Sequence, residues 1–168
     1  MFNLSEPRKE TIWQQYVALF LAKEAAPEYW STKHCNRMLT NLMGCRDFSW
    51  HVVGITQKAL IQYKGQDFKR MGRDGITRGH IVPRAETAEK VMNLDHYLSK
   101  EEFFNTWLTN DKTVLCARGE NKKVLPEFIE FENSENLFNC ENMIVGHRHK
   151  KQEIEFLRNL YKTHFGSQ

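Results

Sequence analysis

The sequence predicts an α+β protein, with helices at both ends of the chain and short strands in the middle. Apolar residues recur at helical spacing in the first quarter of the chain, and an amphipathic helical pattern returns at its C-terminal end. Between these ends lie short runs rich in β-branched and aromatic residues, which are typical of strands. A chain of 168 residues without repeats or Gly/Ser-rich linkers is expected to form one domain with a substantial core.

Two helices are predicted at the start of a mainly helical N-terminal part, which we take as residues 1–63. Ser5 is placed to cap the first helix, and Pro27 ends it. Ser31 is placed to cap the second helix, and Gly44 stops it. The residues expected to face inward are Ile12, Tyr16, Leu19 and Phe20 in the first helix, and Cys35, Met38, Leu39 and Leu42 in the second.

The remaining elements follow from strand-like runs, turn residues and one capping pattern. Ser99 followed by Glu102 matches the capping box that opens a helix. Residues 64–75 contain three glycines and many charges, so we predict a loop there. Strands are predicted at 48–55, 76–82, 111–116 and 142–146, and further helices at 56–63, within 85–108, from 117 to 125 and from 147 to 165.

The composition is that of an ordinary soluble globular protein, with 40% hydrophobic and 27% charged residues. No stretch approaches the roughly 20 apolar residues that a membrane span requires, and the N-terminus lacks the layout of a signal peptide. We therefore expect a cytoplasmic protein. Because the sequence has no Cys-x-x-Cys pair, we expect reduced, mostly buried thiols at Cys35, Cys45, Cys116 and Cys140.

The charge of the chain is segregated, although the net charge is only +3. Residues 64–84 carry six basic and two acidic side chains, a net charge of +4, whereas residues 127–141 carry five glutamates and no lysine or arginine. Locally basic segments attract phosphate. This one contains His80, in the sequence "ITRGHIVPR". The combination predicts a nucleic-acid-binding surface with a histidine in it.

Phosphodiester hydrolysis can be performed by residue types that occur in this part of the chain. A neutral histidine can take a proton from water, because its pKa lies near the working pH. Mg²⁺ prefers oxygen ligands, among them an asparagine carbonyl. A strand-borne histidine and a helix-borne asparagine thus form a sufficient minimal site, and His80 and Asn121 are the candidates. The structural alternative for His80 is a partly buried ring bonded to a backbone carbonyl.

The segments "GHIVPR" and "DKTVLCARGENKK" together resemble the HNH, or ββα-metal, nucleases, and in particular the HNH domain of the RNA-guided CRISPR nucleases. The resemblance covers residues 76–123. It implies a ββα-metal core there, preceded by the N-terminal helices and followed by a C-terminal extension at 124–168 with a closing helix. It also implies that His80 is the general base and Asn121 a metal ligand, while the central residue that braces the loop, a further candidate ligand, is Asn110 or Asp111.

Two features depart from the HNH pattern. Gly79 stands where HNH nucleases usually carry an acidic or histidine ligand, and the connection from His80 to Asn121 is longer than in compact HNH units. The "TRGH" sequence resembles instead the Asp-Arg-Gly-His motif of the nonspecific DNA/RNA nucleases, with Thr77 in place of the aspartate. That resemblance implies that Arg78 assists at the scissile phosphate.

A second register within the same family is open. The segment "CENMIVGHRHKK" also resembles the second half of an HNH motif, with Asn142 as the central residue and His147 or His149 as the ligand. Its spacing from Asn142 to the histidines is shorter than usual, and it makes the loop after His80 very long. We therefore prefer Asn121 at this stage.

The prediction is a metal-dependent endonuclease that cleaves double-stranded DNA with Mg²⁺ or Mn²⁺. By analogy within the resembled family, helical additions on both sides of the core imply a stand-alone, site-specific enzyme such as a type II restriction endonuclease, and a palindromic target then implies a homodimer. The alternatives are a nonspecific DNA/RNA nuclease and a nucleic-acid-binding protein without activity. Besides His80 and Arg78, the residues expected to contact nucleic acid are Arg70, Arg73, Arg84, Lys122, Lys123, Arg148 and Lys150.

Overall fold

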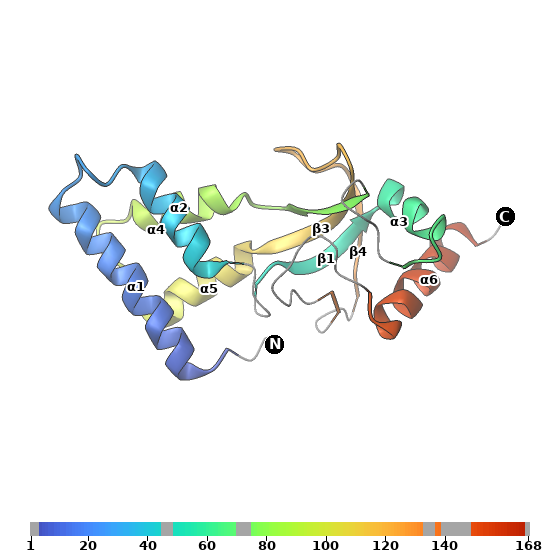
Figure 1. Ribbon diagram of the computed structural model, residues 1–168, viewed down its shortest axis with the longest axis horizontal. Helices are drawn as coiled ribbons and strands as arrows, with labels where there is room; N and C mark the ends of the chain where they lie inside the picture. The colour runs from blue at the N-terminus through green and yellow to red at the C-terminus, as the bar shows by residue number, and fades with distance from the viewer. Residues whose placement is uncertain (1–3, 45–48, 70–74, 133–136, 139–148, 167–168) are drawn as a thin grey trace. The chain divides into compact units, whose positions relative to one another are not determined.

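The computed structural model describes residues 4–44, 49–69, 75–132, 137–138 and 149–166 (Figure 1). The chain divides into two compact units. The helical unit is formed by residues 2–44 and 82–111, and the sheet unit by residues 45–81 and 112–168. The sequence analysis expects a single domain, because no linker marks this division. The chain enters the helical unit a second time between β2 (Ile76–His80) and β3 (Lys112–Ala117), two strands of the sheet unit.

The helical unit contains α1 (Glu6–Ala25), α2 (Thr32–Met43), α4 (Arg84–Met92) and α5 (Lys100–Asn110). Tyr16 of α1 lies at its centre, fully buried and stacked on Phe103 of α5 with 4.4 Å between the ring centroids. The Tyr16 hydroxyl donates to the Val91 carbonyl of α4 and accepts from the Leu98 N–H. The Tyr16 side chain therefore connects α1 with α4, with the Leu98 backbone and with α5.

Most sequence predictions for this unit are confirmed. The four residues expected to face inward from α1 are buried, the Ser31 hydroxyl caps α2, and Ser99 and Glu102 form a complete capping box on α5. Two details are wrong. Ser5 occupies the N-cap position of α1 without a side-chain capping bond. Met38, predicted to face inward, is 47% exposed, because the buried residues of α2 lie along Cys35, Leu39 and Met43.

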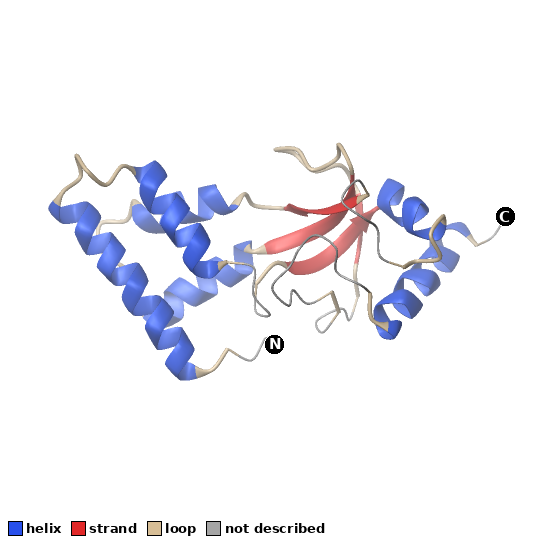
Figure 2. Ribbon diagram, viewed as in Figure 1, coloured by secondary structure: helices blue, strands red, loops and turns tan. Residues whose placement is uncertain are grey.

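The sheet unit contains four strands, β1 (His51–Thr56), β2 (Ile76–His80), β3 (Lys112–Ala117) and β4 (Phe128–Glu130), and two helices, α3 (Gln57–Lys64) and α6 (Lys151–Phe165). The strand order is β2-β3-β1-β4, so β2 lies at an edge of the described sheet (Figure 2). β3 pairs antiparallel with β2 and parallel with β1, and β4 pairs antiparallel with β1. The fold is thus α+β, as the sequence predicts.

The core of the sheet unit lies on the face that α3 and α6 cover. Leu60 and Tyr63 of α3 and Leu157 of α6 belong to one buried cluster with Leu115 and Ala117 of β3. Figure 1 shows α3 and α6 against one another beside the sheet. Leu115 pairs with Arg78 and Ala117 with Ile76 across the β2–β3 ladder, so Ile76, Arg78 and His80 project towards this helix-covered face.

The helix predicted at 117–125 is absent from the structure. Gly119 has a φ of +87°, in the left-handed region that ends helices, and the Glu120 carboxylate turns back to accept from the Ala117 N–H and the Thr56 hydroxyl. These contacts close a turn instead, and the chain then forms β4, which the sequence analysis does not predict. The strand predicted at 142–146 lies outside the described residues. Within the described part of the chain, no helix has both the length and the apolar character needed to cross a bilayer.

Candidate functional site

His80 ends the edge strand β2 and is partly buried. Its ring meets the Trp50 ring edge to face, with 4.3 Å between the centroids. Opposite His80 in the ladder lies Thr113, whose hydroxyl donates to the carbonyls of Trp50 and His51. The imidazole is therefore held by packing at the end of a strand, where a rigid element positions a reactive group better than a loop does.

Arg78, two residues before His80 on the same face, is buried and does not extend towards solvent. Its guanidinium donates to the Trp50 carbonyl at 3.1 Å and to the Phe138 carbonyl at 2.5 Å. Both acceptor residues have left-handed backbone conformations, with φ of 60° and 58°, which bulky residues adopt at a cost of about 1–3 kcal/mol. The charge-assisted bonds from Arg78 offset this cost. Arg78 thus holds Trp50, and through it His80, rather than an exposed phosphate.

The electrostatics of Arg78 follow from its surroundings. Burial lowers the pKa of the Arg78 guanidinium to about 10, while Tyr63 and Glu153 act in the opposite direction. Burial also raises the pKa of the Tyr63 hydroxyl. Arg78 is therefore still a cation at neutral pH, and a buried cation is tolerated because carbonyl oxygens and a nearby carboxylate surround it.

The first turn of α6 is attached to the same face of β2. Glu153 is 2% exposed, and its carboxylate accepts from the N–H groups of Phe138 and Lys150, both at 2.6 Å. Since Phe138 also accepts from Arg78, a continuous chain of hydrogen bonds runs from β2 through Phe138 to the start of α6. The edge strand β2, which ends at His80, is thus connected by hydrogen bonds to the first turn of α6.

Asn121 lies on the other face of the sheet. A Cβ atom built on Gly79 would lie 3.1 Å from the Asn121 Oδ1, 3.1 Å from the Cys116 Sγ and 2.7 Å from a Leu125 methyl. Neighbouring residues of a strand point to opposite faces, so Gly79 faces Asn121 whereas His80 faces α6 and Trp50. The Asn121 amide donates to the Arg78 carbonyl at 3.4 Å. The structure does not bring His80 and Asn121 to a common cation.

The same contacts explain Gly79, which replaces the acidic ligand of the HNH pattern. A side chain there would require the Leu125 side chain to shift, and an acidic one would point away from His80. Glycine at this position therefore serves the packing of the 121–125 segment on β2 and says nothing against a catalytic histidine.

Arg84, Asp111 and Asn110 lie in the helical unit. Arg84 is 8% exposed and forms a two-pronged ion pair with Asp111, with N–O distances of 2.7 and 2.8 Å. It also donates to the carbonyls of Thr40 and Gly44. Asp111 is 3% exposed and follows the C-terminal residue of α5, which is Asn110. In this structure Arg84 and Asp111 neutralise one another rather than contacting phosphate or metal.

Of the other predicted residues, some are described by the structure and some lie outside its described part. Lys122 and Lys123 are exposed after the turn that follows β3, and Lys150 is exposed at the start of α6. His149 is held by both ring nitrogens, with Nε2 3.2 Å from the Tyr63 hydroxyl oxygen and Nδ1 3.0 Å from the Phe68 carbonyl oxygen. The predicted residues that lie outside the described part of the chain are Arg70, Arg73, Asn142, His147 and Arg148.

Sequence reasoning missed Trp50 and Glu153. Both act through contacts that are distant in sequence, Trp50 on His80 and Glu153 on Phe138. Glu153 carries one usable signal, since it stands three residues after Lys150, where a capping carboxylate is expected at the start of a helix. Trp50 carries none beyond being an aromatic residue next to a strand.

The described residues include no group of three or more histidine, cysteine, aspartate or glutamate side chains able to hold a metal ion. The pair predicted from the sequence, His80 and Asn121, does not fit one cation because the two residues face opposite ways. Comparison of the chain with protein-family models, with curated proteins and with solved structures gives no match in any of the three.

Proposed function

We propose that the protein is a nuclease that hydrolyses phosphodiester bonds in double-stranded DNA, with His80 as the general base. The observation that carries the proposal is the position of His80 at the end of an edge strand, partly buried and packed on Trp50, on a strand whose Arg78 is connected to α6 through Phe138 and Glu153. An imidazole in such a place can take a proton from the attacking water. The basic surroundings of β2 in the sequence favour phosphate.

The helix of the proposed ββα-metal core is α6 rather than a helix at Asn121. Leu157 of α6 shares the buried cluster with Leu115 and Ala117 of β3, and α6 is connected to β2 through Glu153, Phe138 and Arg78. This assignment favours the second register of the sequence analysis, in which Asn142 and His147 supply the downstream residues. The connection of 82–111 between β2 and β3 is long because it folds as part of the helical unit.

We further propose a requirement for a divalent cation, Mg²⁺ or Mn²⁺. When bound, such a cation would stabilise the charge that develops on the phosphate and the leaving oxygen. In the second register of the sequence resemblance, its candidate ligand is His147 or His149. A restriction-type, site-specific homodimer remains the form of the enzyme that we propose, on the sequence resemblance alone.

The test is plasmid cleavage with Mg²⁺ or Mn²⁺ by the wild type and by three variants, His80→Ala, Asn121→Ala and His147→Ala. His96→Ala is the matched control, because His96 is exposed in the helical unit. We expect His80→Ala and His147→Ala to abolish cleavage and the other two to retain it. Loss of cleavage in Asn121→Ala together with retained cleavage in His147→Ala would favour the Asn121 register instead. Discrete bands indicate site specificity, and a smear indicates a nonspecific nuclease.

A protein that binds DNA without cleaving it is the second candidate. Burial of Arg78 favours it, because the arginine that the nuclease resemblance places at the scissile phosphate donates to the protein's own carbonyls instead. Binding of DNA by the wild type without nicking under either metal would establish this alternative and exclude the nuclease.

A further inference from the structure

We propose that α2 is the helix through which the protein binds the major groove of duplex DNA. Five of its residues line one hollow on the surface of the helical unit, and every one of them has a hydrogen-bonding side chain. They recur three and four residues apart, which places them on a single face of the helix. The five residues, which we call the α2 face, are Lys33, Asn36, Arg37, Thr40 and Asn41.

The α2 face carries two cations that the described part of the chain does not neutralise. Lys33 and Arg37 are exposed and make no hydrogen bond or ion pair with the described part of the chain, and α2 contains no acidic residue. Four other basic residues of the unit are engaged by carboxylates or carbonyls, whereas Lys90 of α4 is exposed like Lys33 and Arg37. The engaged residues are Lys9 with Glu6, Lys23 with Met92, Arg84 with Asp111, and Lys100 with Glu6 and Glu10. Two unneutralised cations on one helix face are complementary to a phosphate backbone.

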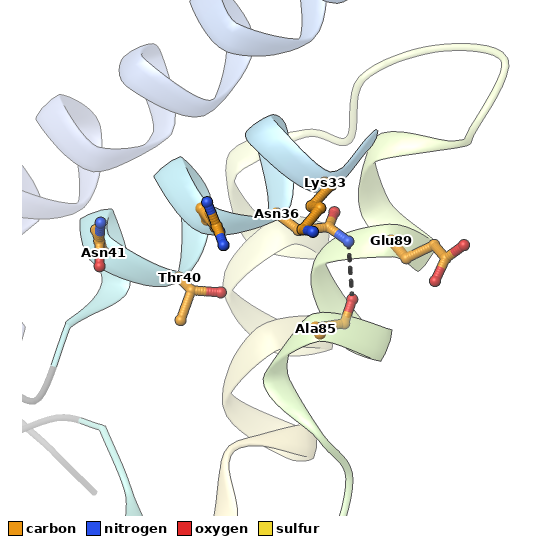
Figure 3. A pocket seen from close by; sticks show the side chains of 7 residues that line it. Lys33, Asn36, Thr40, Asn41, Ala85 and Glu89 are labelled. Atoms are coloured by element: carbon orange, nitrogen blue, oxygen red, sulfur yellow. Dashed lines mark hydrogen bonds between the residues drawn. The ribbon is translucent and has the colours of Figure 1, made fainter. Parts of the chain in front are cut away.

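The α2 face is also fixed in place. Figure 3 shows the Asn36 amide reaching across the hollow to the Ala85 carbonyl at the start of α4, a distance of 3.4 Å. At the other end of α2, the carbonyls of Thr40 and Gly44 accept from the buried Arg84. A helix held to its neighbour at both ends presents its outer side chains in a defined geometry, which is what recognition of bases requires.

The residue types match the edges of base pairs. Arginine and lysine pair with guanine and asparagine with adenine in the major groove, and Glu89, which lines the α4 side of the hollow, can accept from the amino group of cytosine. The groove of B-form DNA is about 12 Å wide and admits one helix, whereas the major groove of duplex RNA is too narrow to be read by side chains. The choice of DNA as the partner rests on the proposed nuclease function. The position and charge of the α2 face are observed independently of that function.

The experiment measures DNA binding separately from cleavage. The full chain with His80→Ala, in the absence of metal, is titrated with a fluorescent random-sequence DNA duplex at several salt concentrations. The test variant adds Lys33→Ala and Arg37→Ala, and the matched control adds Lys90→Ala and Lys162→Ala, which remove two exposed lysines elsewhere. We expect the slope of log K against log salt to fall in magnitude by about 2 in the test variant and to stay unchanged in the control, with equal circular dichroism.

Equal slopes in the test and control variants would overturn the proposal, as would an equal loss of binding when an RNA duplex replaces the DNA duplex. Cleavage that depends on His80 but not on the α2 face would leave the nuclease standing without this helix. DNA binding that depends on the α2 face, without any cleavage by the wild type, would support the α2 proposal and contradict the nuclease function. Asn41→Ala is expected to leave the salt slope unchanged and to reduce discrimination between a selected duplex and a scrambled one by about tenfold.

Discussion

Two arginines illustrate what residue types alone can and cannot indicate. Arg78 and Arg84 lie in the basic segment around His80, which indicates phosphate binding, yet both are buried and donate to the protein itself. The partners that decide this are distant in sequence: Phe138 for Arg78 and Asp111 for Arg84. A single sequence reveals the charge of a side chain but not which long-range acceptors will surround it, so exposed and buried arginines look alike.

The Arg84–Asp111 pair allows a stability prediction. Arg84→Met leaves a buried carboxylate without its partner and is expected to lower the free energy of unfolding by about 3–5 kcal/mol. The double variant Arg84→Met/Asp111→Leu removes both charges and should recover most of that loss. Urea denaturation of the three proteins measures the difference. A double variant no more stable than Arg84→Met would show that the bonds to Thr40 and Gly44, and not the buried charge, dominate.

Trp50 allows a prediction about the candidate site that depends on the proposed nuclease function. Trp50→Ala removes the ring that packs on His80 but keeps the backbone carbonyl that Arg78 and Thr113 use. Because a misplaced base loses proton-transfer efficiency, we expect kcat to fall by about 10- to 100-fold with little change in KM. Trp50→Phe should restore most of the activity. Identical kcat values for Trp50→Ala and the wild type would exclude a positioning role.

Secondary-structure elements were predictable where local chemistry decides them. Helix caps and β-branched runs predicted α1 to α3, β1 to β3, α5 and α6 to within a few residues. The turn at Gly119 and the strand β4 were not predictable, because they depend on Glu120 bonding to Thr56, a residue of another strand. The face on which Asn121 lies follows from that turn. The strand that carries His80 was therefore predictable, whereas the face on which Asn121 lies was not.

The capping box of α5 can be tested at this scale. Ser99→Ala should lower the free energy of unfolding by about 1 kcal/mol at neutral pH. The hydrogen bonds from Ser99 lower the pKa of the Glu102 carboxyl, so the contribution of that carboxylate is present above its ordinary pKa of 4.5 and is lost as the pH falls through its lowered value in the folded protein.

Urea denaturation of the wild type and Ser99→Ala, at neutral pH and in acid, should therefore show a difference that shrinks on acidification. Thr109→Ala, at an exposed position of the same helix, is the control and should show no such trend. A difference that is constant with pH would mean that Glu102 does not contribute to the cap.

For the whole molecule, the division into two units was the least predictable feature. Both units are discontinuous in sequence, and no change of composition marks the crossings at residues 44, 81 and 111. The division nevertheless explains an observation from the sequence, namely the long connection between His80 and the third strand. Since residues 82–111 belong to the core of the helical unit, the proposed catalytic strand and the proposed DNA-binding helix α2 are stabilised by different sets of side chains.

This separation predicts that the two units lose structure independently. Trp107 is fully buried in the helical unit, and Trp107→Ala is expected to destabilise that unit by about 3–5 kcal/mol. Loosening of residues 82–111 only lengthens the loop between β2 and β3, and doubling the length of a loop costs about 0.6 kcal/mol. Amide hydrogen exchange followed by NMR should therefore show lost protection in α1 and α5, while β3 and α6 keep most of theirs. A parallel loss of protection in β3 would show that the chain unfolds as a single cooperative body despite its two units.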